Sequence, residues 1–283
     1  MMPMGLTSWT KIILLSVLCL VVIGVIVYFA LPPKKVIMRG LLVDLELEGP
    51  DSSRYKELRD ALTVRLPAEI PALNPFEIDL SYCHFPHVTR EMLNPKQIDF
   101  LMLSPQGTPW RLYKDEARRR LDGFAGQLRK VIGESSLPVL GICGGHQFLV
   151  LAFGGEVGFI DPAFVGKEVQ QYPREAVSER GVVWLETLAH DPILTGVAGH
   201  PGGFRAAQSH YEEVKRLPSA FINLAQSLLS PVQLIRLGDK PVYGVAFHPE
   251  RCWTGSGCNG TVVCEGKQLL GNFLTMVATQ KGK

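Results

Sequence analysis

The sequence carries almost no net charge. Its 283 residues include 29 lysines and arginines against 27 aspartates and glutamates, which gives a formal net charge of +2. A nucleic-acid-binding domain normally has a clear excess of basic residues on one face. We therefore expect no nucleic-acid partner. The length suits one sizeable α/β domain better than two enzymes.

Several other patterns are missing. The chain has no heptads, no internal repeat and no low-complexity tract, which excludes coiled coils and repeat folds. It has no G-x-x-x-x-G-K segment, so we expect no nucleotide-binding P-loop. Cys252, Cys258 and Cys264 are not arranged in the close pairs that hold zinc, so we expect no metal site and no role for them. A disulfide would become plausible outside the cytoplasm, where Cys83 makes their number even.

One long uncharged run lies near the N-terminus. Residues 12–31 ("IILLSVLCLVVIGVIVYFAL") have the length of an α-helix that crosses the hydrocarbon core of a membrane. The run is too long for a signal-peptide core and lacks a good cleavage site. We expect a tail at 1–11, a membrane-spanning helix at 12–31 and a linker at 32–35. More basic residues follow the run than precede it, which predicts a single-pass membrane protein with its large domain in the cytoplasm.

The rest of the chain alternates between strand and helix patterns up to about Gly155 and is strand-rich beyond it. Such alternation is typical of a parallel sheet covered on both faces. We expect an α/β fold, flavodoxin-like, with an open, mostly parallel sheet, flanking helices and a strand-rich C-terminal half. It would form one domain over 36–279, followed by a tail at 280–283. The expected strands are 36–47, 76–82, 100–103, 137–142, 181–185, 204–208, 221–225, 232–237 and 243–247, and the expected helices are 51–65, 112–132, one after Cys143, and 265–278.

Cys143 lies between two glycines at the end of an expected strand. The segment "PVLGICGGHQFLVLAFGG" contains a G-x-C-x-G pattern at a strand-to-helix junction, which is the layout of a nucleophile elbow. The following helix would point its N-terminus at the sulfur and lower the pKa of the thiol. The same residues could also be a buried structural cysteine whose glycines serve only packing. The cysteine alone therefore does not decide between the two.

A candidate base lies in "VYGVAFHPE", more than a hundred residues further on. Pro249 favours an extended conformation for His248. Residues two apart in an extended chain point to the same face, so Glu250 would lie beside the His248 ring. A carboxylate in that place orients an imidazole and stabilises its charged form. Together with Cys143, the pair favours nucleophilic catalysis.

These two segments resemble the signature elements of class I glutamine amidotransferases, whose triad is formed by an elbow cysteine and a His-x-Glu pair. Further segments extend the resemblance over most of residues 36–278. "LLVDLELEGPDSSRYKEL" resembles the opening strand and helix of that family, and "LLGNFL" its closing helix. "DPILTGV" and "SHYEEVKRLPSAFINLAQS" resemble the segment before its final strand.

The resemblance implies a role for each matching position. Cys143 would attack the side-chain amide of glutamine and form a γ-glutamyl thioester. His248 would pass the thiol proton to the leaving ammonia while Glu250 holds its ring. The backbone N–H of Gly144 would be one oxyanion donor. The positions that would bind the substrate are Gln147, Ser209 and His210.

The loop expected to supply the second oxyanion donor differs from the family pattern. It reads "LSPQGTPW", which resembles S-P-G-P-G-T-P with one residue missing and Gln106 where glycine is expected. Glycine permits backbone conformations that a side chain resists. If Gln106 blocks the loop, acyl transfer would lose about 10²–10³ in rate. Alternatively Gly107 is the donor, or the loop becomes ready only when a partner docks.

Three functions are compatible with these residues. The first is a membrane-anchored, cysteine-dependent glutamine amidotransferase that passes ammonia to a synthetase on a separate chain. The second is a γ-glutamyl hydrolase that acts on γ-glutamyl peptides or conjugates. The third is a non-catalytic scaffold or sensor that keeps the fold, which the intact triad disfavours and the unusual loop favours. None of the three requires a cofactor.

Overall fold

The computed structural model describes residues 16–17, 35–49, 52–197, 202–253 and 264–282. The chain divides into two units, Met1–Val36 and Ile37–Lys283. Most of the first unit, and with it nearly all of the run at 12–31, lies outside the described residues.

The expected membrane span is not upheld. Among the residues that the structure describes, no helix is both long and apolar enough to cross a membrane. The longest of them, α4 (Asp115–Glu134), is amphipathic and charged on its outer face. The predictions of a membrane-spanning helix, a single-pass location and a cytoplasmic orientation are therefore wrong. The hydropathy of a run shows only that a helix of that length could span a bilayer.

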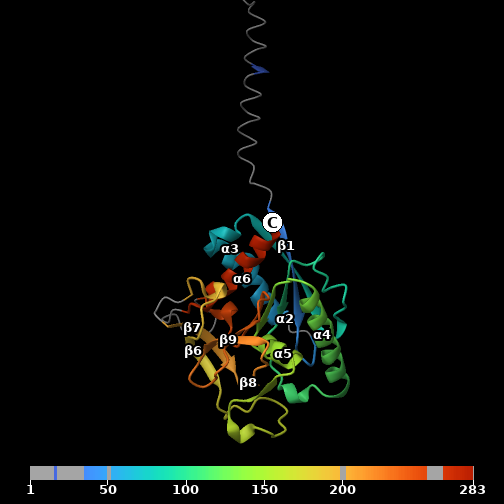
Figure 1. Cartoon of the computed structure of the whole chain (residues 1–283), viewed down its shortest axis with the longest axis vertical. Helices are drawn as coiled ribbons and strands as arrows, with labels where there is room; N and C mark the ends of the chain where they lie inside the picture. The colour runs from blue at the N-terminus through green and yellow to red at the C-terminus, as the bar shows by residue number, and fades with distance from the viewer. Residues whose placement is uncertain (1–15, 18–34, 50–51, 198–201, 254–263, 283) are drawn as a thin grey trace, which may run out of the picture. The chain divides into compact units, whose positions relative to one another are not determined.

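A nine-stranded sheet forms the centre of the second unit, in the order β2-β1-β3-β4-β11-β10-β9-β6-β7 (Figure 1). The pairs β1/β3, β3/β4 and β4/β11 are parallel. The pairs from β11 to β7 are antiparallel. The sheet is therefore mixed, and the prediction of a mostly parallel sheet describes only its first half. The strands are β1 (Val36–Asp44), β2 (Phe76–His84), β3 (Phe100–Leu103), β4 (Val139–Ile142), β6 (Glu179–Thr187), β7 (Gly203–His210), β9 (Phe221–Gln226), β10 (Leu234–Leu237) and β11 (Val242–Val245).

Two further strands, β5 (Glu156–Phe159) and β8 (Glu212–Arg216), pair antiparallel in a small second sheet that the sequence did not predict. The reason is visible in β8, which reads "EEVKR". Charged residues surround its single valine, and a sequence of this kind is typical of a loop. The pairing with β5 and the burial of Glu212 and Val214 override that local preference.

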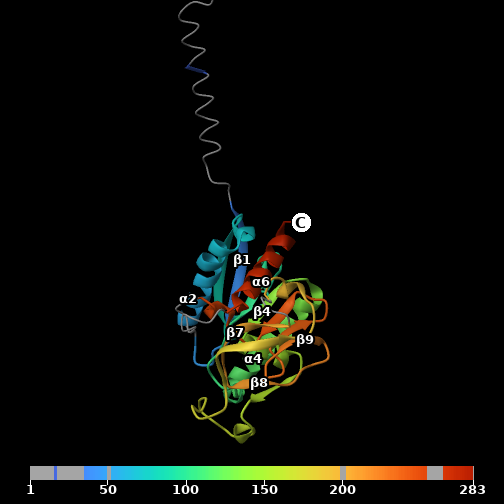
Figure 2. The same cartoon turned by 90° about the vertical axis from the view of Figure 1, so that its left-hand side faces the viewer.

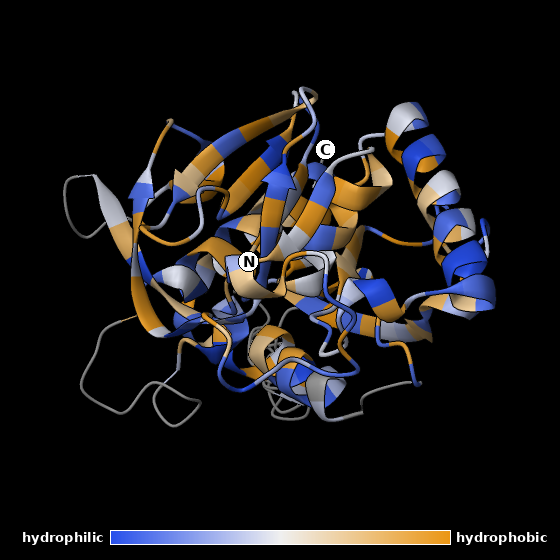
Figure 3. Ribbon diagram, turned by 90° about the horizontal axis from the view of Figure 1, so that it is seen from below, coloured by the Kyte–Doolittle hydropathy of each residue, from blue (hydrophilic) through white to orange (hydrophobic). Residues whose placement is uncertain are grey.

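Helices cover both faces of the large sheet (Figures 1 and 2). Besides α4, they are α2 (Ser52–Asp60), α3 (Leu66–Glu69), α5 (Gly144–Ala152) and α6 (Gly266–Lys281). One core lies between the sheet and the helices α2, α3 and α6, and another between the sheet and the helices α4 and α5. Side chains of β1 point alternately to the two faces of the sheet and so contribute to both cores. Met38 and Leu42 lie in the first core, and Leu41 and Val43 lie in the second. Figure 3 shows hydrophobic stretches in the strands, and helices whose turns mix hydrophobic and hydrophilic residues.

The predicted helix at 112–132 is confirmed as α4. Its buried residues repeat at helical spacing and include Leu121, Phe124 and Leu128. The basic run Arg118–Arg120 lies on the exposed face and forms ion pairs with Glu116 and Asp122. This run therefore belongs to the solvated face of the helix.

The parallel strands β1, β3, β4 and β11 end at the same edge of the sheet. In open α/β sheets, ligand sites lie outside this carboxyl edge. Glu46, the loop that starts at Ser104, Cys143 and His248 each follow one of these four strands. Neighbouring strands thus bring together residues that are far apart in the sequence.

Candidate active site

Cys143 occupies a sharp turn between β4 and α5. Its backbone has φ +50° and ψ −101°, a conformation that costs about 1–3 kcal/mol in a residue with a side chain. The flanking glycines allow the turn to pack closely. A Cβ at Gly141 would lie 2.4 Å from the carbonyl oxygen of Gly145, and a Cβ at Gly145 would lie 2.4 Å from that of Leu103. The turn holds the Cys143 side chain almost completely buried at the carboxyl edge of the sheet.

His248 and Glu250 form a buried pair just after β11. The short 3₁₀ turn Pro249–Arg251 follows His248 and carries Glu250. His248 Nδ1 lies 2.7 Å from Glu250 Oε1, and both side chains are buried. Because Nδ1 faces a carboxylate, it carries the proton, and Nε2 remains for exchange with the thiol.

The electrostatics favour a charged Cys143–His248 pair. Burial raises the pKa of the Cys143 thiol, but the charge of His248 opposes it, and the net result is a pKa below the ordinary value. Burial lowers the pKa of His248, but Glu250 and Cys143 outweigh this and raise it to about 9. The two shifts together favour a thiolate beside an imidazolium, the reactive form of a nucleophilic cysteine.

Both groups open into a pocket of about 200 Å³. The pocket lies at the carboxyl edge and also contains residues from β7, β8 and the loop after β3. Glu250 is not part of the lining among the described residues, and acts on the pocket through His248. Besides Cys143 and His248, the lining includes five further residues proposed from the sequence: Gln106, Gly107, Gln147, Ser209 and His210.

The side chains of Gln147 and His210 make polar contacts with other residues of the protein. The Gln147 amide accepts from Trp110 Nε1 at 2.7 Å and donates to the carbonyl of Glu212 at 2.7 Å. The ring nitrogens of His210 lie 3.0 Å from the Glu212 carbonyl and 3.0 Å from Glu179 Oε2. These contacts position the pocket wall. A direct contact of either side chain with a substrate stays a prediction.

Glu212 is a pocket residue that the sequence reasoning missed. Its carboxylate is buried, and burial raises its pKa although the Tyr172 hydroxyl and the Trp110 N–H donate to it. Tyr172 donates to Oε2 at 2.6 Å and stacks on Tyr211 with centroids 4.9 Å apart. Glu212 lies two residues after His210 on the pocket wall. This short distance from a proposed substrate-binding residue was the only hint in the sequence that Glu212 belongs to the pocket.

The loop after β3 holds Gln106 without backbone strain. Neither Gln106 nor Gly107 has a positive φ, so this conformation does not require glycine at position 106. Thr108 N donates to Gln106 Oε1 at 2.6 Å, which folds the side chain back onto its own loop. A Cβ at Gly144 would lie 2.8 Å from the backbone nitrogen of Gln106. The main chain of the loop thus packs directly against the N-terminus of α5.

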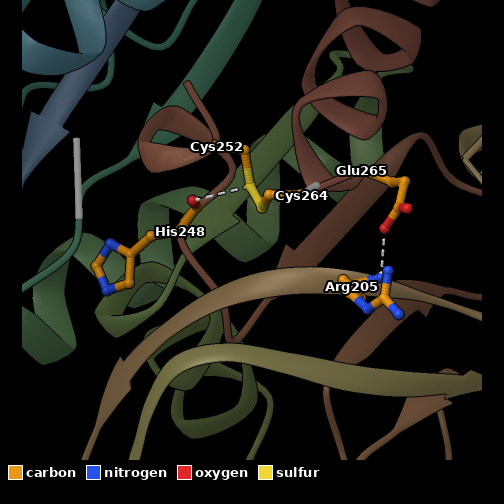
Figure 4. The surroundings of a disulfide bond; sticks show 5 residues. All are labelled: Arg205, His248, Cys252, Cys264 and Glu265. Carbon is orange, nitrogen blue, oxygen red and sulfur yellow. Dashed lines mark hydrogen bonds between the residues drawn. A yellow bond between two sulfur atoms is a disulfide. The ribbon is translucent and has the colours of Figure 1, made fainter. Parts of the chain in front are cut away.

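A disulfide joins Cys252 to Cys264, twelve residues further on (Figure 4). It ties the end of the 3₁₀ turn that carries Glu250 to the start of α6. Cys252 Sγ also lies 3.8 Å from the carbonyl oxygen of His248. The expectation that these two cysteines have no role is therefore wrong. Cys258 lies outside the described residues, and Cys83 is free.

Removing the disulfide should destabilise the domain. We expect Cys252→Ser combined with Cys264→Ser to lower the free energy of unfolding by up to about 3 kcal/mol, because the bond closes a short loop of the unfolded chain. Urea denaturation measures the loss, and Cys83→Ser is the matched control. A dithiol reductant should destabilise the wild type by the same amount and leave the double variant unchanged. Equal stability of wild type and double variant would contradict the disulfide.

Proteins of known family are similar to this chain in sequence. The model of the family Glutamine amidotransferase class-I matches residues 88–259, which contain Cys143, His248 and Glu250. A glutamine-hydrolyzing GMP synthase subunit of Pyrococcus abyssi is 37% identical over 124 residues, which cover 44% of this chain and 56% of that protein. The subunit of the same name from Methanopyrus kandleri is 32% identical over 174 residues, which cover 57% of this chain and 84% of that protein.

A solved structure shows the same fold. A protein described as a GMP synthase subunit, from Thermoplasma acidophilum, has a TM-score of 0.58 at 21% identity, and the match covers 88% of this chain and 98% of that one. In sequence, the chain spans a little over half the length of the Pyrococcus relative. The family model, in contrast, covers more than half of this chain and includes all three residues of the Cys-His-Glu site. The chain therefore belongs to the glutamine amidotransferase class-I family.

Proposed function

We propose that this protein hydrolyses the side-chain amide of glutamine and releases ammonia for a synthetase on a separate chain. The observation that carries the proposal is the buried Cys143 at a pocket that it shares with His248, whose ring is held by Glu250. The relatives named above are glutamine-hydrolyzing subunits, which supports a separate partner.

The geometry supports a two-step reaction. The Cys143 thiolate attacks the amide carbon, and His248 gives its proton to the departing nitrogen, so that ammonia leaves and a γ-glutamyl thioester remains. His248 then takes a proton from water, which attacks the thioester and releases glutamate and the thiolate. The N–H groups of Gly144 and Gln106 would stabilise the oxyanion in both steps. The Gly107 N–H is already donated to Glu46.

Glu212 would bind the ammonium group of the substrate. We expect Glu212→Gln to raise KM for glutamine by about 10–100-fold with a smaller change in kcat, because it removes a charge-assisted hydrogen bond. Burial raises the pKa of Glu212, so KM should also rise in the wild type as the pH falls toward that value. Steady-state kinetics over a series from about pH 8 down to about pH 5 test both effects.

The matched control for this variant is Glu213→Gln, which makes the same charge change at the next residue. Glu213 pairs with Lys215 and does not line the pocket. An unchanged KM in Glu212→Gln, or an equal increase in Glu213→Gln, would contradict the proposed role of Glu212.

The proposed activity is tested with the full chain. Ammonia release from glutamine and glutamate release from γ-glutamyl peptides are measured side by side, alone and with membrane-free cell extract as a source of partner. We expect release of ammonia from glutamine. Turnover of γ-glutamyl peptides alone would instead support a γ-glutamyl hydrolase. Absence of both, together with failure of an electrophilic glutamine analogue to label Cys143, would support a non-catalytic role.

A further inference from the structure

Glu46 has no role in the reaction described above, yet its carboxylate contacts the loop beside Cys143. Its Oε2 accepts the backbone N–H of Gly107 at 2.8 Å. Its Oε1 accepts the hydroxyl of Thr108 and, at 3.2 Å, the N–H of Leu47. Both oxygens therefore hold the segment that the reaction needs as one side of its oxyanion site.

The backbone around Glu46 is itself fixed, so the carboxylate points in a defined direction. The Glu46 carbonyl lies 2.6 Å from His84 Nε2, and its N–H donates to Asp44 at 2.9 Å. The Ser104 hydroxyl accepts the N–H of the neighbouring Leu45 at 3.0 Å. Since β1 and β3 are adjacent and parallel, Glu46 and the loop after β3 meet at the same edge of the sheet.

The contact bears on which N–H of the loop can donate to the oxyanion. The Gly107 N–H points at the Glu46 carboxylate, whereas the backbone nitrogen of Gln106 packs against Gly144. An oxyanion donor must be aimed before the charge develops, because reorientation during the reaction loses the stabilisation. A carboxylate that pins Gly107 and Thr108 thereby fixes the orientation of the preceding peptide group.

We propose that Glu46 is a positioning residue that holds the Pro105–Thr108 loop with the Gln106 N–H as the second oxyanion donor. This inference rests on the proposed function. It assigns Glu46 to stabilisation of the transition state, with no part in substrate binding or in the reactivity of the thiol. It also explains how the chain uses a loop with glutamine in place of glycine.

Glu46→Ala should lower kcat for glutamine by about 10–10²-fold, somewhat less than the loss of an oxyanion donor, and change KM by less than about threefold. Glu46→Gln should recover most of kcat, because the amide oxygen can still accept the Gly107 N–H. Glu48→Ala and Glu48→Gln are the matched controls, since Glu48 is an exposed carboxylate two residues away. Both controls should have wild-type kcat.

Two further readouts separate this role from general damage. Alkylation of Cys143 by iodoacetamide forms no oxyanion, so its rate should be the same in Glu46→Ala and in the wild type. Hydrogen exchange of the amides in 104–108 should be faster in Glu46→Ala by about tenfold or more, because the loop loses its fixed acceptor. A parallel loss of alkylation, an unchanged kcat or an unchanged exchange rate would each overturn the proposal. If the wild type releases no ammonia, the proposed function fails, and hydrogen exchange alone decides on Glu46.

Discussion

Replacing Cys143 with alanine should reduce ammonia release from glutamine by about 10⁴–10⁶-fold, the range expected when the nucleophile of a covalent mechanism is removed. No other described cysteine can substitute for it. Cys83 is free but does not line the pocket, and Cys252 and Cys264 are joined to each other. A coupled ammonia assay measures the loss.

The matched control is Cys83→Ala, which removes the other cysteine that is free and buried in the described part of the chain and should keep wild-type activity. Thermal unfolding of Cys143→Ala should remain close to that of the wild type, because the change leaves the turn between β4 and α5 in place. Residual activity within about tenfold of the wild type would show that the reaction does not use a Cys143 thioester.

Replacing His248 with alanine should lower kcat/KM by about 10²–10⁴-fold and also change the pH dependence of Cys143. In the wild type, the lowered pKa of Cys143 keeps the thiolate populated below the ordinary thiol pKa. Iodoacetamide should therefore alkylate Cys143 at pH values below the ordinary thiol pKa, and the rate should fall only as the pH drops through the lowered pKa of Cys143. Without the His248 charge, burial raises the pKa of Cys143, so the alkylation profile should move to higher pH.

The pH dependence of ammonia release at high pH depends on His248. The pKa of His248 is raised to about 9, so ammonia release should decline as the pH rises through this value and the ring loses its proton. Glu250→Gln removes the charge that raises the pKa of His248, and the decline should then begin at lower pH. An alkylation profile that is identical in the wild type and in His248→Ala would contradict the thiolate–imidazolium pair.

The sequence predicts the local elements that build the site because each carries its own signal. β3 was predicted with the bounds that it has, and β4 and β11 lie within two residues or so of their predicted ends. Apolar runs of four residues next to glycine and proline are enough to mark such strands. The close approach of His248 and Glu250 was expected from an extended chain. The structure places the two side chains 2.7 Å apart, but a 3₁₀ turn at Pro249–Arg251 brings them together.

The other parts of the site depend on contacts between distant segments, which no local sequence pattern predicts. The contact of Glu46 with Gly107 joins positions sixty-one residues apart in the chain, through the pairing of β1 and β3. Tyr172 reaches Glu212 from a segment without an expected strand or helix, and Glu212 lies in a strand too charged to be recognised. At residues 12–31 the sequence reasoning predicted a feature instead of missing one, since hydropathy alone suggested a membrane span that the described residues do not support.

The central claim is that glutamine is cleaved through a thioester on Cys143. The most direct measurement is acid quenching of the full-length protein during turnover of glutamine, followed by mass spectrometry of the peptide that contains Cys143. We expect a γ-glutamyl group on Cys143 that is absent from Cys143→Ala and disappears once glutamine is consumed. Ammonia release without this adduct, or an adduct on Cys83 in its place, would contradict the assignment of Cys143 as the nucleophile.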